Sequence, residues 1–376
     1  MTIKLILGVL PLLAIGSGVA QAGNISVEAG GLARHERVEV AFVLDTTGSM
    51  GDLIDGAKRK IWSIATTIVD TNPSADIAMA LVAYRDRGDD YVVKSTPLST
   101  DVQALYGKLV KLEAAGGGDD PESVNEALDK AISGLQWSSG ANVKHIVFLV
   151  GDAPPHMDYN QERQYPQILK AAAEKHIVVN AVQAGEIPET MTIWKEIAQF
   201  GHGRYISIPQ NGGEVVIVVT PFDDDILHMQ EELDGSIVPY GSDGQRQELN
   251  KKMAAKAAAP NSVKIDNSGF YSKRKIAREV VTGRGDLVSD VSNDNASLSS
   301  IAESDLPDDL KAVPVPQRKQ WLDQKLKSRK VLEDKMSGLI AKRDAYVFEQ
   351  RKKKIASKGG DSFDQAVEDT LKTQLN

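Results

Sequence analysis

The sequence predicts an α/β protein with a doubly wound, mostly parallel sheet, followed by a mainly helical, partly disordered C-terminal region. Apolar runs of strand length alternate with helical patterns from residue 36 to residue 235, which is typical of parallel α/β sheets. After residue 241 the composition becomes polar and then strongly charged. We therefore divide the chain into a signal peptide over residues 1–22, an α/β domain over 36–235, a polar linker region over 241–316 and a charged helical region over 317–376.

The first 22 residues have the pattern of a secretory signal peptide. Lys4 precedes an apolar run over residues 5–20, and Ala20-Gln21-Ala22 forms a small-x-small cleavage site. Glycine and proline residues interrupt the run, whereas a membrane span needs about 20 good apolar residues. No later apolar run approaches that length. We therefore expect an exported protein, periplasmic or secreted after cleavage, with no transmembrane segment in the mature chain.

The first half of the α/β domain alternates strands and helices. Residues 38–44 form an apolar run, as expected for a strand that is buried on both faces. Apolar residues at helical spacing predict a helix over 51–70. A second buried strand over 77–84, a shorter edge strand over 91–94 and an amphipathic helix over 102–112 follow.

The second half of the domain continues the same alternation. A run of three glycines precedes Pro121, which suits the first turn of a helix that extends to about residue 135. The remaining elements are expected to be strands over 143–150, 177–182 and 205–208, and helices over 161–175, 193–200 and from Thr220 to about residue 233.

The C-terminal region carries a long basic helical pattern. Residues 317–354 hold 13 basic and five acidic residues. Their apolar residues form an interrupted stripe that could be a coiled-coil or hairpin seam, so the helix is a candidate for self-association. The alternative is a solvated basic helix face. The stripe consists of Leu322, Leu326, Leu332, Met336, Leu339, Ile340 and Val347.

Composition excludes several classes of function. The 376-residue chain has 44 Lys plus Arg and 52 Asp plus Glu, which gives a formal net charge of −8. We expect no nucleic-acid partner, because sequence-independent binding depends on neutralising phosphates. The absence of cysteine excludes disulfides, thiolate metal sites, cysteine nucleophiles and a lipid anchor on cysteine.

The end of the first predicted strand carries the most informative motif, Asp45-Thr46-Thr47-Gly48-Ser49-Met50. An acid and two hydroxyls stand at alternate positions, directly after a buried strand and before a helix. In a doubly wound sheet the carboxyl ends of the strands form the binding crevice. Oxygen ligands from Asp45, Thr47 and Ser49 suit a hard cation such as Mg²⁺, with Mn²⁺ or Ca²⁺ as substitutes.

Two further loops place acids at comparable positions. Asp119 and Asp120 lie between the glycine run and the following helix, and Asp152 follows the strand over 143–150. A helix N-cap would explain any one of these acids. That explanation does not predict acids at matching positions in three loops, so we interpret Asp45, Asp119 and Asp152 as parts of one metal site.

With these three loops in place, residues 36–235 resemble the von Willebrand factor type A domain, and the loops resemble its metal-ion-dependent adhesion site. Asp45, Thr47 and Ser49 match the DxSxS motif, with Thr in place of the first Ser, and Asp152 matches the acid after the fourth main strand. The pieces DTTGSM, AYRD, GGGDDPES and GDAPPH are similar to the hemicentin-type subgroup, and the C-terminal part resembles bacterial exported proteins of this type.

One departure from the family concerns the middle loop. The family often has Thr where this chain has Asp119, with Asp120 beside it, and either acid is a candidate for the place of that Thr. Asp86, in the AYRD segment, is a further candidate ligand or a residue that supports the ligands. His156 is expected to be a loop residue beside this site.

The resemblance implies a non-enzymatic adhesion or assembly protein. In the family, the cation keeps an open position that an acidic side chain of a partner protein fills. Two alternatives stay open. One is a structural envelope scaffold with a degenerate metal site, whose basic helix binds an anionic component. The other is a metal-dependent hydrolase in which Asp119 or Asp152 acts as a base.

Overall fold

The computed structural model describes the chain in several stretches, and both the predicted signal peptide and the candidate ligand Asp119 lie outside them. None of the helices in these stretches has the length and apolar character needed to cross a membrane. The described residues are 36–118, 120–210, 218–275, 277, 279–354 and 363–375.

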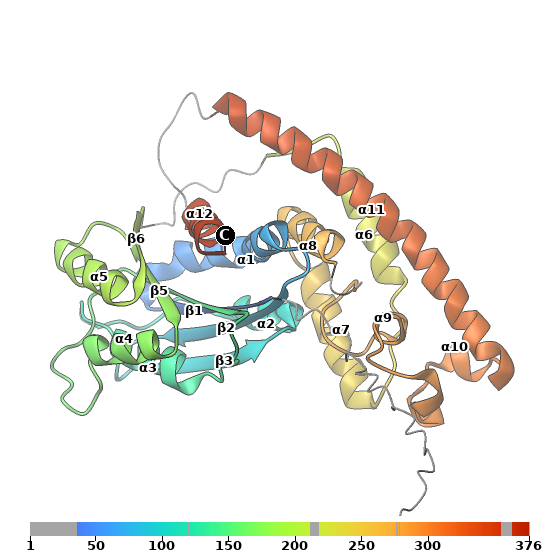
Figure 1. Ribbon diagram of the computed structural model, residues 1–376, viewed down its shortest axis with the longest axis horizontal. Coiled ribbons are helices and arrows are strands. Elements are labelled where there is room, and N and C mark those ends of the chain that lie inside the picture. The colour runs from blue at the N-terminus through green and yellow to red at the C-terminus, as the bar shows by residue number, and fades with distance from the viewer. Residues whose placement is uncertain are drawn as a thin grey trace, which may run out of the picture. The chain divides into compact units, whose positions relative to one another are not determined.

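Six strands form one sheet in the order β3-β2-β1-β4-β5-β6 (Figure 1). All neighbours pair in parallel except β2 and β3, which pair antiparallel at the edge. The predicted doubly wound, mostly parallel sheet is therefore confirmed. The strands are β1 (Arg37–Asp45), β2 (Asp76–Tyr84), β3 (Val93–Ser99), β4 (Val143–Gly151), β5 (Ile177–Ala184) and β6 (His202–Ile208).

Strand β1 lies in the middle of the sheet, and its side chains alternate between two cores. Val40 and Phe42 point into the core that α1 and α2 cover. Ala41 and Val43 belong to the core beneath α3, α4 and α5. This period of two explains why the strand reads as an apolar run, because both faces are buried. The covering helices are α1 (Gly51–Thr71), α2 (Val102–Leu109), α3 (Val124–Asp129), which continues into the π-helix η2 (Lys130–Gly134), α4 (Tyr165–Glu174) and α5 (Pro188–Phe200).

Several predicted boundaries differ from the structure, and two of the differences lie near the edge strand and the middle loop. The edge strand begins at Val93 and continues to Ser99, beyond the predicted 91–94. Helix α3 begins at Val124, although the helix was predicted to start at Pro121. The preceding Glu122 instead forms an isolated parallel β-bridge with Pro155, which joins the loop before α3 to the loop after β4.

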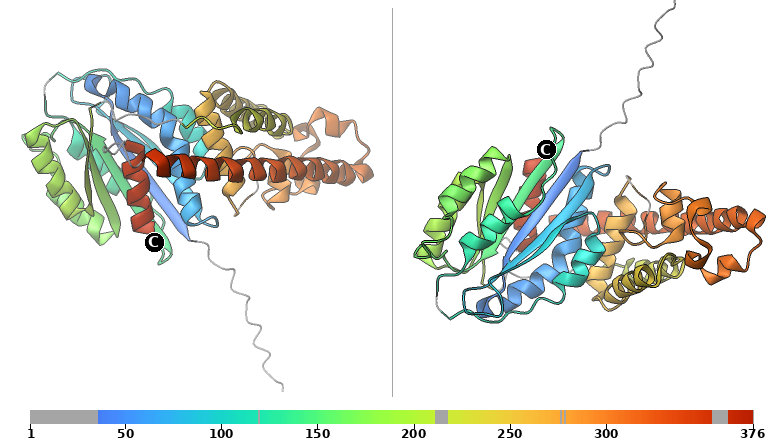
Figure 2. Two further views of the ribbon diagram at one scale, coloured as in Figure 1. Left: turned by 90° about the horizontal axis from the view of Figure 1, so that it is seen from above. Right: turned by 90° about the horizontal axis from the view of Figure 1, so that it is seen from below.

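The last helix, α12 (Phe363–Leu375), completes the core on the α1 side of the sheet. Val367 and Leu371 are fully buried in the same apolar cluster as Phe148 of β4. The side chains of Asn180 and Gln374 exchange hydrogen bonds of 2.8 and 3.1 Å, and the Ser63 hydroxyl donates to Glu368 at 2.7 Å. Figures 1 and 2 show α12 beside α1. The chain end therefore packs against a sheet whose last strand ended at residue 208.

Residues 241–316 correct the prediction of a polar linker, because they form helices and turns with a buried interior. Helix α8 packs on α1, and the ring of Phe270 contacts that of Trp62 at an angle of 56°, with ring centroids 5.3 Å apart. The sequence looks like a linker because its apolar residues are few, while ion pairs and small apolar clusters supply the packing. The elements after the sheet are α6 (Asp223–Gly235), α7 (Asp243–Ala257), α8 (Asn261–Lys273), α9 (Leu287–Ser292), η3 (Leu298–Ser300), η4 (Glu303–Asp305), α10 (Asp308–Lys311) and η5 (Val315–Gln317).

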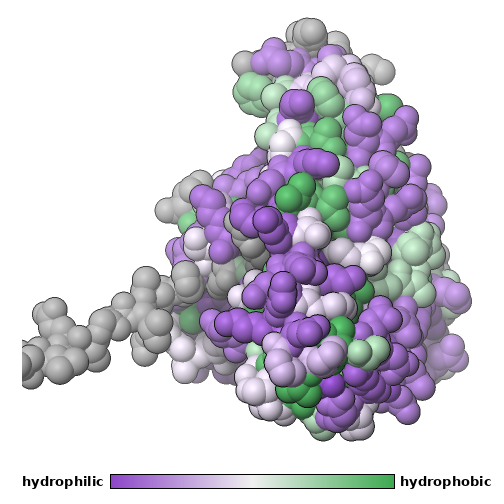
Figure 3. All heavy atoms as spheres, turned by 90° about the vertical axis from the view of Figure 1, so that its right-hand side faces the viewer, coloured by the Kyte–Doolittle hydropathy of each residue, from purple (hydrophilic) through white to green (hydrophobic). Residues whose placement is uncertain are grey.

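The predicted basic helix is α11 (Arg318–Lys354), and its apolar stripe packs within the chain. Leu322, Met336 and Ile340 are buried in clusters that also hold residues of α6, α8 and α9. Figure 3 looks onto this side and shows mainly hydrophilic residues, with hydrophobic ones in small groups. The buried part of the stripe is therefore not available as a seam for self-association. The stripe looks interrupted because Arg329 occupies the same buried face.

Candidate metal centre

Three loops meet at the carboxyl end of the sheet, beside the central pair β1 and β4. The strand order changes direction there, since β2 lies on one side of β1 and β4 on the other. Asp45 is the last residue of β1, and Asp152 directly follows the end of β4. Parallel pairing thus brings the two acids together at the carboxyl ends of neighbouring strands, as predicted.

Asp45 is fully buried, and only one of its two carboxylate oxygens has a hydrogen-bond partner. Its Oδ1 accepts from the backbone N–H of Thr47 at 2.8 Å and from the Thr47 hydroxyl at 2.7 Å. The Thr47 hydroxyl lies 3.4 Å from that of Ser49. The structure therefore brings Asp45, Thr47 and Ser49 together, with Oδ2 of Asp45 left without a partner.

Backbone hydrogen bonds join this loop to the glycine-rich segment. Gly48 N–H donates to the carbonyl of Gly116 at 3.1 Å, and Ala115 N–H donates to the carbonyl of Thr46 at 3.1 Å. Gly116 and Gly117 both have positive φ angles, near 78° and 79°. Successive residues in this conformation favour glycine. The glycine run is thus the means by which the second loop turns back onto the first.

The second loop is joined in turn to the third through Glu122. Its backbone N–H donates to the carbonyl of Pro154 at 2.9 Å, and its carbonyl accepts from His156 N–H at 3.1 Å. The Glu122 side chain is only 3% exposed, and its Oε2 has no hydrogen-bond partner. A Cβ at Gly117 would lie 3.2 Å from both Glu122 Oε1 and Thr47 Cβ. Glu122 therefore points toward the loop that carries Asp45.

Asp152 is buried and already has one side-chain partner. Gln210 Nε2 donates to its Oδ2 at 2.6 Å and lies 3.4 Å from the carbonyl oxygen of Ser49. The backbone carbonyl of Asp152 accepts from the Thr190 hydroxyl at 3.0 Å. Gln210, two residues after the carboxyl end of β6, thus links the loops that follow β1 and β4.

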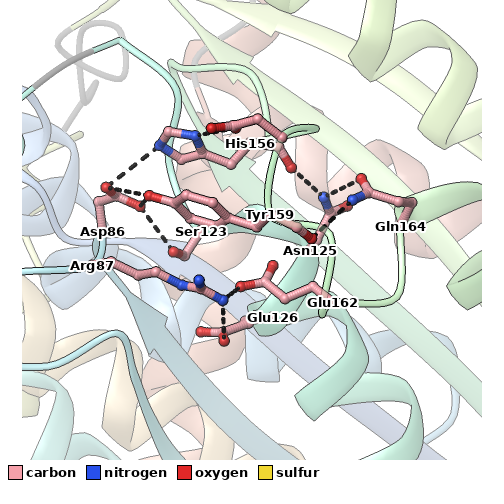
Figure 4. Close-up of polar contacts among 10 residues, drawn as sticks. Asp86, Arg87, Ser123, Asn125, Glu126, His156, Tyr159, Glu162 and Gln164 are labelled. Atoms are coloured by element: carbon pink, nitrogen blue, oxygen red, sulfur yellow. Dashed lines mark hydrogen bonds and ion pairs between the residues drawn. The ribbon is translucent and has the colours of Figure 1, made fainter.

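Asp86 lies beside this centre in a network of protein groups (Figure 4). Its carboxylate accepts from the Ser123 hydroxyl at 2.9 Å and from the Tyr159 hydroxyl at 3.2 Å, and His156 Nε2 lies 3.4 Å away. The Tyr159 ring stacks on His156 and lies under the Arg87 guanidinium, 3.9 Å from ring centre to Cζ. These contacts favour a supporting role for Asp86 over direct coordination.

The structure describes one of the two acids of the middle loop. Asp119 lies outside the described residues, and Asp120 is exposed. Within the described ranges, no three Asp, Glu or His side chains are grouped so as to hold a metal ion by themselves. The predicted ligand set also contains the hydroxyls of Thr47 and Ser49.

Burial and neighbouring charges raise the pKa values of two of these acids and of one tyrosine. Burial, together with the nearby charge of Asp152, raises the pKa of Asp45 to about 7, although hydrogen bonds from Thr47 and the contact with the Tyr84 hydroxyl oppose this shift. Burial raises the pKa of Glu122 to about 9, and the charges of Asp45, Asp86, Asp89 and Asp152 add to it. Burial also raises the pKa of Tyr84, and the charges of Asp45, Asp152 and Glu122 add to it.

These residues fit a hard divalent cation. Among the described residues, Oδ2 of Asp45, Oε2 of Glu122 and the Tyr84 hydroxyl are buried polar atoms without a well-formed hydrogen bond. Unsatisfied buried groups of this kind are rare and often mark the place of a bound ion or water. The donor set at the loops is oxygen alone, which is the set that Mg²⁺, Mn²⁺ and Ca²⁺ prefer.

Comparison with known proteins agrees with this architecture. The family model described as the von Willebrand factor A domain matches residues 39–221. The comparisons support a von Willebrand factor A domain in this chain. The matched segment contains strands β2 to β6 and all but the first two residues of β1, whereas helix α12 lies outside it.

Relatives share only this part of the chain. The von Willebrand factor A domain-containing protein 7 of Rattus norvegicus is 36% identical over 96 residues, which are 25% of this chain and 10% of that protein. An ariadne-like RING finger protein of Acanthamoeba polyphaga mimivirus is 30% identical over 123 residues, 33% of this chain and 12% of that protein. This chain thus spans about a tenth of the length of these curated relatives.

A solved structure with a von Willebrand factor A domain is also similar. The crystal structure of the SpRpn10 VWA domain has 13% sequence identity and a TM-score of 0.35, and the match covers 49% of this chain and all of that chain.

Sequence reasoning missed three residues of the centre. Glu122 follows Asp119, Asp120 and Pro121 in the same loop, so its place beside the predicted ligands could have been noticed. Tyr84 ends the second strand, as Asp45 ends the first. Gln210 has no comparable signal, because it follows the last strand and reaches Asp152 only in the folded sheet.

Proposed function

We propose that the von Willebrand factor A domain binds a divalent cation, Mg²⁺ in the first place, at the loops after β1 and β4. Asp45, Thr47 and Ser49 hold the cation, with Asp152 and an acid of the middle loop, Asp119 or Asp120, completing the set. The observation that carries the proposal is the fully buried carboxylate of Asp45, whose Oδ2 has no basic partner among the described residues and only the neutral Tyr84 hydroxyl beside it. An isolated buried carboxylate is costly unless a counter-charge or a cation accompanies it.

The domain indicates a role in protein–protein interaction or adhesion. We extend this to a non-enzymatic protein of the hemicentin-like kind, exported to the periplasm or the medium, in which the cation bridges to an acidic side chain of a partner protein. The oxygen-only centre supports the bridging role, because a hard cation that keeps an open position accepts a carboxylate. The buried stripe of α11 gives no support to self-association through that helix.

Calorimetric titration of Mg²⁺ and Mn²⁺ into the full chain tests the proposal. We expect saturable binding in the wild type and its loss in Asp45→Ala, while Asp55→Ala, which removes an exposed acid of α1, binds as the wild type does. Mg²⁺ at about 100 times its dissociation constant should raise the free energy of unfolding of the wild type by about 2.7 kcal/mol. No binding in the wild type, or equal binding in Asp45→Ala, would overturn the assignment.

A further inference from the structure

Glu122 is a third buried acid at the candidate centre, and like Asp45 and Asp152 it has no Lys or Arg partner among the described residues. Buried acids elsewhere do have such partners, as Asp286 has in Arg329 and Glu39 has in Arg37. Glu122 is 3% exposed, and one of its carboxylate oxygens has neither a hydrogen bond nor an ion pair. Hydrogen bonds to the third loop fix its backbone, which places the start of the side chain beside the loop that carries Asp45.

The surroundings of Glu122 point it to the cation centre. Its Oε1 and the Cβ of Thr47 both lie 3.2 Å from the place where a Cβ at Gly117 would stand. The Thr47 hydroxyl in turn donates to Oδ1 of Asp45. The buried Tyr84 hydroxyl lies beside Oδ2 of Asp45, because both would contact a Cβ added at Gly151, at 2.4 and 3.1 Å. Glu122 is thus close enough to Asp45 for the charge of one to act on the other.

We propose that Glu122 is an additional carboxylate of the cation site, which the metal requires in order to reach its full affinity. This inference rests on the proposed cation binding and names a residue outside the predicted ligand set. Glu122 is almost fully buried on a backbone that the third loop fixes, so its carboxylate is largely ordered before the cation arrives. It therefore contributes charge without the entropy cost of ordering a mobile side chain.

The test compares Glu122→Gln with the wild type by titrating Mg²⁺ and Mn²⁺ into the full chain. We expect the substitution to weaken both cations by about tenfold or more, because it removes a buried negative charge and keeps the shape of the side chain. Glu126→Gln is the matched control. Glu126 lies four residues away and pairs with Arg87, so its loss should change cation affinity by less than about twofold.

A second variant covers the case in which Glu122→Gln fails to fold, which circular dichroism would show. Glu122→Asp keeps the charge and shortens its reach, so we expect it to weaken binding by a smaller factor than Glu122→Gln. Unchanged cation affinity in a folded Glu122 variant would overturn this inference and leave the proposed function standing. No cation binding in the wild type would instead remove the proposed function, and this inference with it.

Discussion

Asp45 and Asp286 are both at most 1% exposed, yet the protein surrounds them differently. Asp286 accepts from the backbone N–H groups of Val238 and Val288 and from the Ser289 hydroxyl, and both of its oxygens pair with Arg329. Asp45 has hydrogen bonds on one oxygen only. One buried acid is fully compensated by the chain itself, and the other lacks a counter-charge.

This difference separates a structural acid, Asp286, from the acid that we propose binds a cation, Asp45. The guanidinium of Arg329 joins α11 to the start of α9, and it also donates to the Ser236 hydroxyl at 2.9 Å. Asp286 is part of an Arg-Gly-Asp tripeptide, but its burial removes it from any surface. The centre at Asp45 holds Glu122 and Asp152 with no Lys or Arg paired to them among the described contacts.

The largest effect should come from breaking the compensated acid. Arg329→Met leaves Asp286 buried without its counter-charge, which should cost about 3–5 kcal/mol of the free energy of unfolding. Denaturant unfolding measures it. Lys311→Met, in an exposed pair with Asp308, should cost no more than about 1 kcal/mol.

A double variant sharpens that result. Adding Asp286→Leu to Arg329→Met removes both charges, so a large part of the loss should return. Equal losses in the single and double variants would show that the unpaired charge is not the cause, and the contrast with Asp45 would then fail.

The next effect should come from removing apolar packing between α12 and the sheet. Leu371 of α12 is fully buried against the sheet, so Leu371→Ala should lower the free energy of unfolding by about 2–5 kcal/mol. Lys372→Ala, at an exposed position of the same helix, should change it by about 0.5 kcal/mol or less. A small loss in Leu371→Ala would mean that α12 does not complete the core, and that the sheet domain is independent of the chain end.

The pH dependence of stability gives the smallest effect. With EDTA present, the raised pKa values of Asp45, about 7, and Glu122, about 9, mean that the folded state holds protons that the unfolded chain releases above about pH 4. This contribution to stability is lost as the pH rises through the folded pKa values. We expect the unfolding temperature in EDTA to fall by a few degrees between pH 5.5 and pH 8.5.

The double variant Asp45→Asn/Glu122→Gln controls for other titrating groups and should reduce that fall. Mg²⁺ should reduce it in the wild type as well, because a cation favours the charged carboxylates. If the wild type and the double variant showed the same pH dependence of the unfolding temperature, the raised pKa values of Asp45 and Glu122 would not be its cause. Differential scanning calorimetry at both pH values gives the comparison.

The sheet and most residues of the candidate metal centre could be predicted from the sequence alone. Buried strands read as apolar runs, and the two central ones, β1 and β4, lead directly into Asp45 and Asp152. Local pattern suffices here, because burial on both faces and the parallel order place strand ends at one edge. Thr47 and Ser49 followed from their spacing after Asp45.

Other features became visible only in the folded structure, because they depend on contacts between segments that are far apart in the sequence. Glu122 and Gln210 reach the centre through a loop bridge and through the end of β6, which leave no periodic pattern in the sequence. Residues 241–316 appeared to be a linker because their packing relies on ion pairs and on a few apolar side chains that come from distant helices. The place of α12 on the sheet was also hidden, since its partners Ser63 and Asn180 lie 305 and 194 positions away from the residues they contact. Contacts between distant segments depend on the folded arrangement, and local sequence pattern carries no record of it.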